Sequence, residues 1–245
     1  MTKKTNIAII IPCYNEQDNI LALYHDIFSI ANETSPYHIT PIFVNDCSTD
    51  NTKQILEENK LTHLNLAVNL GIGGAVQTGF QYAFTNDFDI AIQMDGDGQH
   101  PPSELFKLIL PLINNEADVV IGSRYIIKEG FQSSIFRRIG INYFKWLNHL
   151  LVGIKINDST SGYRALNRRA LKIVSDYYPD EYPEPESIIL FALYKLKVKE
   201  VPVVMRERQS GTSSIRSYKT VYYMFKVTIA IINSRFSFRN TKNII

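Results

Sequence analysis

The chain has 245 residues, of which 45% are hydrophobic and 20% charged, and its formal net charge is 26 − 24 = +2. These values match an ordinary globular protein and exclude a disordered chain, a collagen-like chain, a coiled coil and a nucleic-acid-binding polycation. The charge is uneven, because residues 209–245 carry six basic side chains and no acidic one, which leaves 2 − 6 = −4 on residues 1–208. Two cysteines do not make a disulfide framework, and there is no signal peptide and no apolar run of about 20 residues. We therefore expect a reduced, cytosolic chain without a membrane span.

Short apolar runs alternate with helical patterns through the first half of the chain. The runs that predict strands are 7–11, 39–44, 61–68, 90–94 and 119–122. The patterns that predict helices are 19–31, 51–59 with Asp50 as its N-cap, 74–84 and 102–113. Strands that are apolar on both faces are typical of a parallel sheet with helices on both sides. We predict an α/β fold with an open, twisted, mostly parallel sheet.

The second half is less regular. Helical patterns cover 136–152, 165–178 and 187–196, a strand pattern covers 197–204, and a final amphipathic helix is predicted over 217–233. No repeat and no linker rich in Pro, Gly or Ser interrupts the chain. The simplest division is one compact domain over residues 1–214 and a basic C-terminal appendage over residues 215–245.

Polar clusters follow four of the predicted strands, at 12–16, 45–50, 69–74 and 95–99. Turn chemistry explains any one of them, but ligands of open α/β sheets bind outside the carboxyl ends of the strands. We therefore expect the four clusters to share one site. Asp95 and Asp97 repel each other at the mouth of a buried strand unless a cation lies between them. Paired carboxylates favour Mg²⁺ or Mn²⁺ over zinc, and the alternative is an Asp-Gly turn.

The glycine-rich stretch 71–74 is not a dinucleotide fingerprint, because Val76 stands where a glycine is needed and the stretch follows the third strand. No P-loop is present either. The remaining interpretations are a tight turn that begins a helix, or backbone N–H groups around Gly74 that approach a ligand closely.

Seven motifs, taken in order along the chain, resemble those of a known protein family. They are PCYNE, VNDCSTD, NLGIGGAVQTGF, QMDGDGQHPP, IGSRY, DSTSGYRALNRRAL and VPVVMRERQSGTSS, which span residues 12–214. The chain resembles the family-2 glycosyltransferases and, within them, is similar to the dolichol-phosphate and polyprenyl-phosphate sugar transferases. The resemblance implies a GT-A fold, a nucleotide-diphosphate-sugar donor, a divalent metal and inversion at the anomeric carbon.

The resemblance also implies roles for residues of this chain. Asp95 and Asp97 would bind the metal as a DXD motif, with Gln99 nearby. Arg208, in a flexible lid, would neutralise charge on the leaving phosphate. The donor and acceptor positions implied are Pro12, Tyr14 and Glu16 for the nucleoside, Asp46 for the base or ribose, Arg124 and Arg137 or Arg138 for phosphates, and Ser161 and Gly162 for the donor sugar and acceptor.

Three positions depart from the usual pattern of the family. Asn45 replaces the first acid of an Asp-Asp pair, Ile72 replaces a lysine, and the lid segment 211–214 lacks a lysine. The last two changes remove positive charge near phosphate. The segment 183–186 (Pro-Glu-Pro-Glu) points to no particular substrate.

The acceptor decides whether a base is needed. A lipid phosphate is already ionised, whereas a sugar hydroxyl must lose a proton to a carboxylate. Asp158 is the candidate base, with Glu184 or Glu186 as substitutes, and Asp158 is alternatively a helix N-cap or a partner of Arg164. We expect transfer to a polyprenyl phosphate in cell-envelope glycan synthesis. The alternatives are transfer to a saccharide hydroxyl, a nucleotidyltransferase and an inactive scaffold.

The final predicted helix bears on the location of the enzyme. Val221, Met224, Phe225, Ile231 and Ile232 are placed near one face, and tyrosines and basic residues flank them. This pattern suits a headgroup interface, although a helix packed on the core is also consistent with it. We expect peripheral association with the inner face of an anionic membrane, or a membrane-protein partner or a second copy of the chain, and no nucleic acid.

Overall fold

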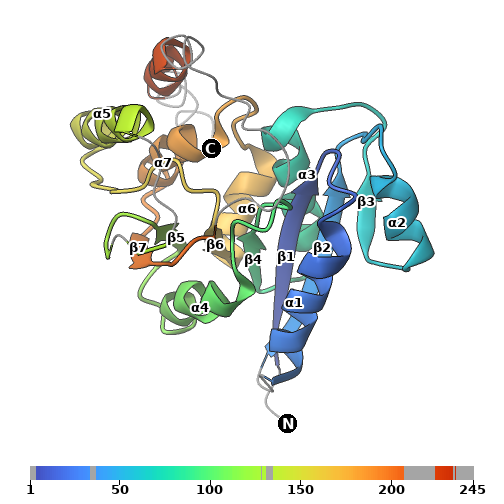
Figure 1. The fold of residues 1–245 in the computed structure, drawn as a ribbon. Helices are drawn as coiled ribbons and strands as arrows, with labels where there is room; N and C mark the ends of the chain where they lie inside the picture. Colours follow the sequence, from blue (N-terminus) through green and yellow to red (C-terminus); the bar gives the residue numbers. More distant parts are fainter. Residues whose placement is uncertain are drawn as a thin grey trace.

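The computed structural model describes residues 4–33, 37–127, 129–130, 135–206, 224–233 and 235. Figure 1 shows a twisted central sheet with helices packed around it. The predicted lid and most of the predicted appendage lie outside the described residues, so the division at residue 214 stays a prediction.

Seven strands form one sheet in the order β3-β2-β1-β4-β6-β5-β7. β1 pairs in parallel with β2 and β4, whereas β6 runs antiparallel to both of its neighbours, β4 and β5. The sheet is therefore mostly parallel, as predicted. The strands are β1 (Thr5–Cys13), β2 (Tyr37–Asn45), β3 (His63–Asn65), β4 (Ile90–Gln93), β5 (Val119–Ser123), β6 (Arg164–Asn167) and β7 (Val198–Pro202).

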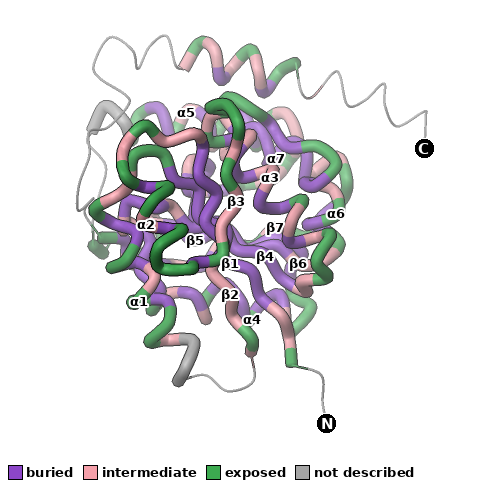
Figure 2. The backbone as a smooth tube through the Cα atoms, turned by 90° about the vertical axis from the view of Figure 1, so that its right-hand side faces the viewer, coloured by how far each residue is buried: buried purple, intermediate pink, exposed green. Residues whose placement is uncertain are grey.

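Helices cover both faces of the sheet because its inner strands are apolar on both faces. Ile7, Ile9 and Ile11 of β1 pack in a cluster with α1, α2 and α4, whereas Ala8 and Ile10 pack in a second cluster with α3, α6 and α7. Each fully buried isoleucine contributes roughly 1.5–3 kcal/mol, and Figure 2 shows these strands buried within the molecule. The helices are α1 (Ile20–Glu33), α2 (Thr52–Glu58), α3 (Gly71–Thr85), η1 (Pro102–Glu104), α4 (Leu105–Ile113), α5 (Ile135–Val152), α6 (Arg168–Asp176) and α7 (Pro183–Leu193).

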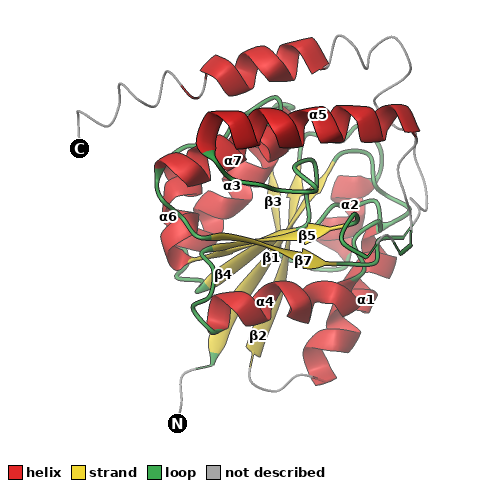
Figure 3. Cartoon of the chain, turned by 90° about the vertical axis from the view of Figure 1, so that its left-hand side faces the viewer, coloured by secondary structure: helices red, strands yellow, loops and turns green. Residues whose placement is uncertain are grey.

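A third apolar cluster lies beyond the sheet. Phe144 and Leu147 of α5 and Ile189 of α7 pack with Val227 and Ile231 of a helix over residues 224–233. Figure 3 shows this last helix lying alongside α5. The prediction of a helix near the C-terminus is thus confirmed for 224–233, while 217–223 lies outside the described residues. Among the described residues, no helix is both long and apolar enough to cross a bilayer.

The helix predicted over 165–178 was wrong at its start. Arg164–Asn167 is the strand β6, and α6 begins only at Arg168. Ala and Leu favour helices, but Ala165 faces one apolar cluster and Leu166 the other, which is the alternation of a strand between two helical layers. The predicted cap of α2 also shifts by one residue, since Asn51 is the cap position and the Asp50 carboxylate accepts the N–H of Thr52 at 2.9 Å.

Candidate active site

The loops that follow β1 and β2 are bonded to each other at the carboxyl edge of the sheet. Asn15 has a positive φ of 57°, and its side-chain Oδ1 accepts the backbone N–H of Thr49 at 2.8 Å. The N–H of Asn15 in turn bonds Ser48 Oγ at 3.0 Å. These bonds hold the adjacent Tyr14 with its side chain about half exposed, so its ring faces solvent at this edge.

Asp46 holds the start of α3. Its two carboxylate oxygens accept the N–H groups of Leu70 at 2.7 Å and Gly71 at 2.9 Å. The side chain is buried, and the carboxylate lies at the N-terminus of a helix, where negative charge is favoured. α3 begins at Gly71, so the stretch 71–74 starts a helix, with Gly74 in its first turn. A contact of Asp46 or Gly74 with a donor remains a prediction.

The loop after β4 presents Asp95 and Asp97. Gly96 lies between them against the loop after β1, where an added Cβ would lie 3.1 Å from the Pro12 carbonyl and 3.6 Å from Glu16 Cγ. The Asp97 side chain is buried and accepts the Gln99 N–H at 3.0 Å, whereas the Asp95 side chain is about one third exposed. The structure thus brings the predicted metal acids next to Pro12 and Glu16.

His100 is a functional candidate to which the sequence assigned no role. Its Nδ1 accepts the N–H of Asp95 at 3.0 Å, and its Nε2 lies 3.7 Å from Asp95 Oδ2. The ring is buried and stacks on Tyr163 with centroids 4.7 Å apart. Burial lowers the pKa of His100 to about 4, against the charge of Asp97. The imidazole is therefore neutral near pH 7 and carries its proton on Nε2, facing Asp95.

Gly162 leaves room beside Asp95. A Cβ at this position would lie 3.0 Å from Gln93 Nε2 and 3.1 Å from Asp95 Oδ1. Gln93 Nε2 also donates to Glu184 Oε1 at 3.4 Å, and Gln93 Oε1 accepts the Tyr178 hydroxyl at 3.3 Å. Burial raises the pKa of Glu184, and the charge of Asp95 raises it further. The segment 183–186 therefore contributes a carboxylate next to the predicted metal acids.

Asp158 forms a buried ion pair with Arg124. Its oxygens accept from Arg124 Nε and Nη2, each at 2.7 Å, and its side chain is fully buried. The Arg124 N–H bonds the same carboxylate at 3.1 Å. Both oxygens of Asp158 are thus engaged by a bidentate arginine, so the geometry does not support this carboxylate as the base. Arg124 is correspondingly engaged, and its contact with a phosphate stays a prediction.

The loop that carries Asp158 is fixed from both sides. Glu200 of β7 accepts the N–H groups of Asn157 at 2.7 Å and Asp158 at 2.8 Å. Arg164 donates to the carbonyls of Ser159 and Ser161 at 3.0 and 2.7 Å, so it is not the partner of Asp158. Ser161 is itself buried, and its hydroxyl accepts the Tyr163 N–H at 3.3 Å.

The residues present fit a divalent cation. Mg²⁺ and Mn²⁺ typically take one or two carboxylates and complete their coordination with water and phosphate oxygens. Asp95 and Asp97 supply the carboxylates, and Gly162 leaves a space that a Cβ would fill. Among the described residues no group of three or more His, Cys, Asp and Glu side chains could hold a metal, so protein side chains do not complete the shell alone. Arg208 and the side chain of Arg137 lie outside the described residues, and Arg138 is exposed on α5.

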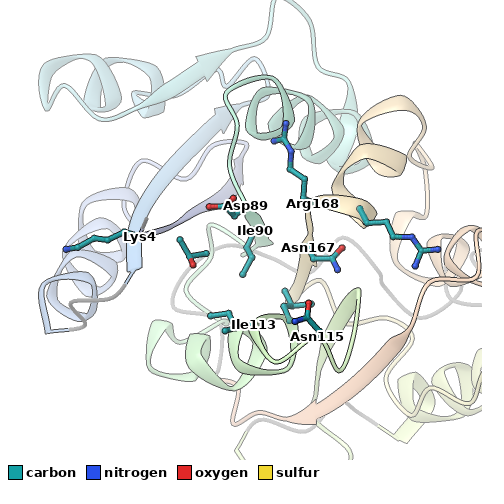
Figure 4. A pocket seen from close by; sticks show the side chains of 10 residues that line it. Lys4, Asp89, Ile90, Ile113, Asn115, Asn167 and Arg168 are labelled. Carbon is teal, nitrogen blue, oxygen red and sulfur yellow. The ribbon is translucent and has the colours of Figure 1, made fainter. Parts of the chain in front are cut away.

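The opposite, amino edge of the sheet carries a pocket (Figure 4). It is lined by Lys4, Asp89, Asn167, Arg168 and Arg169 among others. Arg168 bonds Asp87 at 2.8 Å, and Arg169 bonds Asp118 at 3.1 Å. Asn167 also bonds Asp118, at 2.9 Å. Arg168 and Arg169 are thus each paired with a carboxylate, in contrast to the acids that gather at the carboxyl edge.

The fold and the site define a class of protein: an α/β fold with a mostly parallel sheet and an acid pair at its carboxyl edge. The family model described as "Glycosyl transferase family 2" matches residues 8–174. The chain therefore belongs to glycosyltransferase family 2, as the motifs predicted.

Relatives agree with this family, and a solved structure agrees with the fold. A UDP-N-acetylglucosamine–dolichyl-phosphate N-acetylglucosaminyltransferase of Methanococcus voltae is 31% identical over 80% of this chain and 84% of its own length. A polyprenol monophosphomannose synthase of Mycolicibacterium smegmatis is 29% identical over 89% of this chain and 84% of its own. Among solved structures, glucosyl-3-phosphoglycerate synthase of Mycobacterium tuberculosis, in complex with Mn²⁺, UDP and phosphoglyceric acid, has a TM-score of 0.68 at 17% identity. It covers 95% of this chain and 78% of its own, which supports the fold.

Proposed function

We propose that the enzyme transfers a sugar from a nucleotide-diphosphate sugar to a polyprenyl phosphate at a membrane surface, with inversion at the anomeric carbon. The relatives from M. voltae and M. smegmatis are named for transfer to lipid phosphates of this kind. The observation that carries the proposal is the ion pair of Asp158 with Arg124, which interacts electrostatically with Asp95 of the acid pair. The site has an acid pair suited to a diphosphate-bound cation, while the predicted base is engaged. An ionised phosphate acceptor needs no base.

Asp95 and Asp97 would hold Mg²⁺ or Mn²⁺, which would supply positive charge to the leaving diphosphate. Gly162 leaves the space next to Asp95 open, and the neutral His100 fixes the Asp95 backbone. Tyr14 offers its exposed ring for stacking on the base. Glu16 and Asp46 would take part in nucleoside binding, and Arg208 would approach the phosphates as the sequence predicts. The neighbour structure with Mn²⁺ and UDP supports a site of this kind.

Transfer to a saccharide hydroxyl is the second candidate, and the position of Glu184 favours it. Glu184 accepts a hydrogen bond from Gln93, and Gln93 and Asp95 both lie next to Gly162. A carboxylate other than Asp158 is therefore available near the acid pair. In that reaction Glu184 would accept the proton of the attacking hydroxyl.

A product assay separates the two candidates. The full chain is incubated with UDP-, GDP- and dTDP-sugars and Mn²⁺, with polyprenyl phosphate or with free saccharides as acceptor. We expect the product to be a sugar joined to the lipid through one phosphate. Its formation should stop when EDTA is added and should continue in the Glu184→Gln variant. Transfer only to a saccharide hydroxyl, abolished by Glu184→Gln, would establish the second candidate instead, and full activity in EDTA would contradict metal use.

A further inference from the structure

α5 and the 224–233 helix form a parallel pair. A Cβ at Gly140 would lie 3.7 Å from Met224 Sδ, and Tyr143 Oη lies 3.1 Å from Thr228 Oγ1. Near the other end of the pair, Arg235 Nε donates to the Leu151 carbonyl at 3.2 Å. The contacts advance together along both helices, so the two run in the same direction. The pair therefore presents one continuous surface.

Each helix of the pair is apolar on two faces. The inner faces pack against α7 through the third apolar cluster. The outer faces carry six large exposed apolar side chains, which repeat at helical spacings along each helix. The sequence had placed Phe225, Ile231 and Ile232 on one face, but Ile231 is buried whereas Phe225 is 65% exposed. We call these six residues the two-helix surface: Ile139, Trp146, Leu150, Phe225, Ile229 and Ile232.

The charge of these segments has a single sign. The sequence of α5, IFRRIGINYFKWLNHLLV, contains three basic residues and no acidic one. Residues 209–245, which include the second helix, contain six basic residues and no acidic one. Glu181 bonds Lys226 of the second helix at 3.3 Å and offsets one of these charges. An apolar surface on two helices that carry basic and no acidic side chains of their own matches an anionic bilayer, where aliphatic and aromatic side chains enter the headgroup region and basic side chains meet lipid phosphates.

The position of the helix pair also agrees with a bilayer as its partner. In Figures 1 and 3 both helices lie at the top of the molecule, the end toward which β1 runs from the N-terminus. The loops after β1 and β4, with the acid pair, lie at the carboxyl ends of these strands. A bilayer against the two-helix surface would therefore lie on the same side of the molecule as the candidate site.

We propose that the two-helix surface is a membrane-docking face that seats the enzyme on an anionic lipid bilayer through both α5 and the 224–233 helix. The inference deepens the proposed function, because a polyprenyl phosphate is presented at a bilayer surface. Trp146 and Leu150 of α5 insert at the headgroup level beside Ile229 and Ile232 of the second helix, and the docked bilayer supplies the acceptor to the carboxyl edge of the sheet.

Trp146 provides a built-in reporter, because it is the one tryptophan of the chain. The full-length protein is mixed with vesicles of phosphatidylcholine, with or without one third phosphatidylglycerol, at low and at high salt. We expect co-flotation with the anionic vesicles, a blue shift of Trp146 emission, quenching by brominated acyl chains, and weaker binding as salt rises. Flotation with unchanged Trp146 emission would mean that the basic appendage (residues 215–245) docks without α5, and it would overturn the role of α5.

A pair of matched variants tests the surface without touching the candidate site. Leu150→Gln should weaken vesicle binding about tenfold, because it removes one inserted aliphatic side chain. Leu110→Gln on α4 changes a similarly exposed leucine away from this surface and should leave binding unchanged. Equal effects of the two variants, or protection of Trp146 by self-association without vesicles, would overturn the proposal.

Donor binding, measured with the nucleotide diphosphate in the absence of lipid, separates this inference from the proposed function. Leu150→Gln should bind the nucleotide as the unmodified chain does. Vesicle docking without any sugar transfer to polyprenyl phosphate would contradict the proposed function and leave the docking face in place.

Discussion

The two edges of the sheet use charge in opposite ways. At the amino edge, Arg168 and Arg169 bond Asp87 and Asp118, so each charge contributes to holding the fold. At the carboxyl edge, Asp95 and Asp97 are separated by a single residue, and the pKa of the nearby Glu184 carboxyl is raised by burial and by the charge of Asp95. Like charges held together cost stability, and such an arrangement is typical of sites that bind a cation or perform chemistry. Substitutions at the two edges should therefore separate activity from stability.

The largest effect is expected at Asp97. Asp97→Asn keeps an oxygen that can accept the Gln99 N–H but removes one metal-binding charge. We expect sugar transfer to fall by roughly 10²–10³-fold, comparable to the loss of another electrostatic stabiliser. The melting temperature should stay the same or rise because like-charge repulsion is relieved. Activity assays and calorimetry on the same preparation check both, and unchanged transfer would remove Asp97 from the metal site.

The next effect is on stability and belongs to the amino edge. Asp118 is buried, and burial would raise its pKa, but the N–H of Lys197, the Asn167 amide and the Arg169 charge together lower the pKa of Asp118. A depressed folded-state pKa stabilises the protein above the unfolded-state value, and this stability is lost as the pH falls through the folded-state pKa.

Asp118→Asn should therefore lower the unfolding free energy by about 1–3 kcal/mol at neutral pH and flatten its dependence on pH below about 4. Denaturant titrations at several pH values are the measurement. Sugar transfer below the melting temperature should be unaffected, and a loss of transfer as large as that of Asp97→Asn would erase the contrast between the edges.

A smaller effect is expected at Gly162. Gly162→Ala places a Cβ about 3 Å from Gln93 Nε2 and Asp95 Oδ1, so either side chain must shift. We expect transfer to fall about tenfold with a higher requirement for Mn²⁺, as misplacement of a catalytic group costs rate. Gly140→Ala on α5 is the matched control, because its Cβ would make an ordinary 3.7 Å contact with Met224 Sδ, away from the candidate site. If sugar transfer by Gly162→Ala needs no more Mn²⁺ than transfer by the unmodified chain, then the function of Asp95 does not depend on the space beside Gly162.

The smallest effect is expected for the exposed ion pair at the amino edge. Asp87→Asn removes its charge from Arg168, while asparagine tolerates the positive φ of 58° at this position. Exposed pairs contribute little, so the unfolding free energy should change by less than about 0.5 kcal/mol. A larger loss in thermal denaturation would indicate that the pairs of this edge act as one network.

Local patterns predicted most of the sheet, its helices and the acid pair. The apolar runs of β1, β4 and β5 are visible in the sequence because burial on both faces leaves no polar positions. The four-residue strand β6 was not predicted, since its neighbours β4 and β5 come from elsewhere in the chain and give no local signal.

The same reason explains the partners that the sequence did not predict. Asp158 meets Arg124 across 34 residues, and Glu200 supports Asp158 across 42. Glu184 reaches Gln93 across 91 residues. Residue types indicated that these carboxylates were candidates for chemistry, but only the folded sheet decides which of them are engaged in ion pairs.

The reversed strand β6 has a consequence for how the chain is made. The strands β1 to β4 form an adjacent set that can assemble as soon as residue 93 has emerged from the ribosome. β5 emerges next, yet both of its neighbours, β6 and β7, are synthesised later. The apolar β5 must therefore wait with two open edges, which is the situation in which nascent chains associate with one another. Synthesis of Arg164–Asn167 is the event that joins β5 to the rest of the sheet.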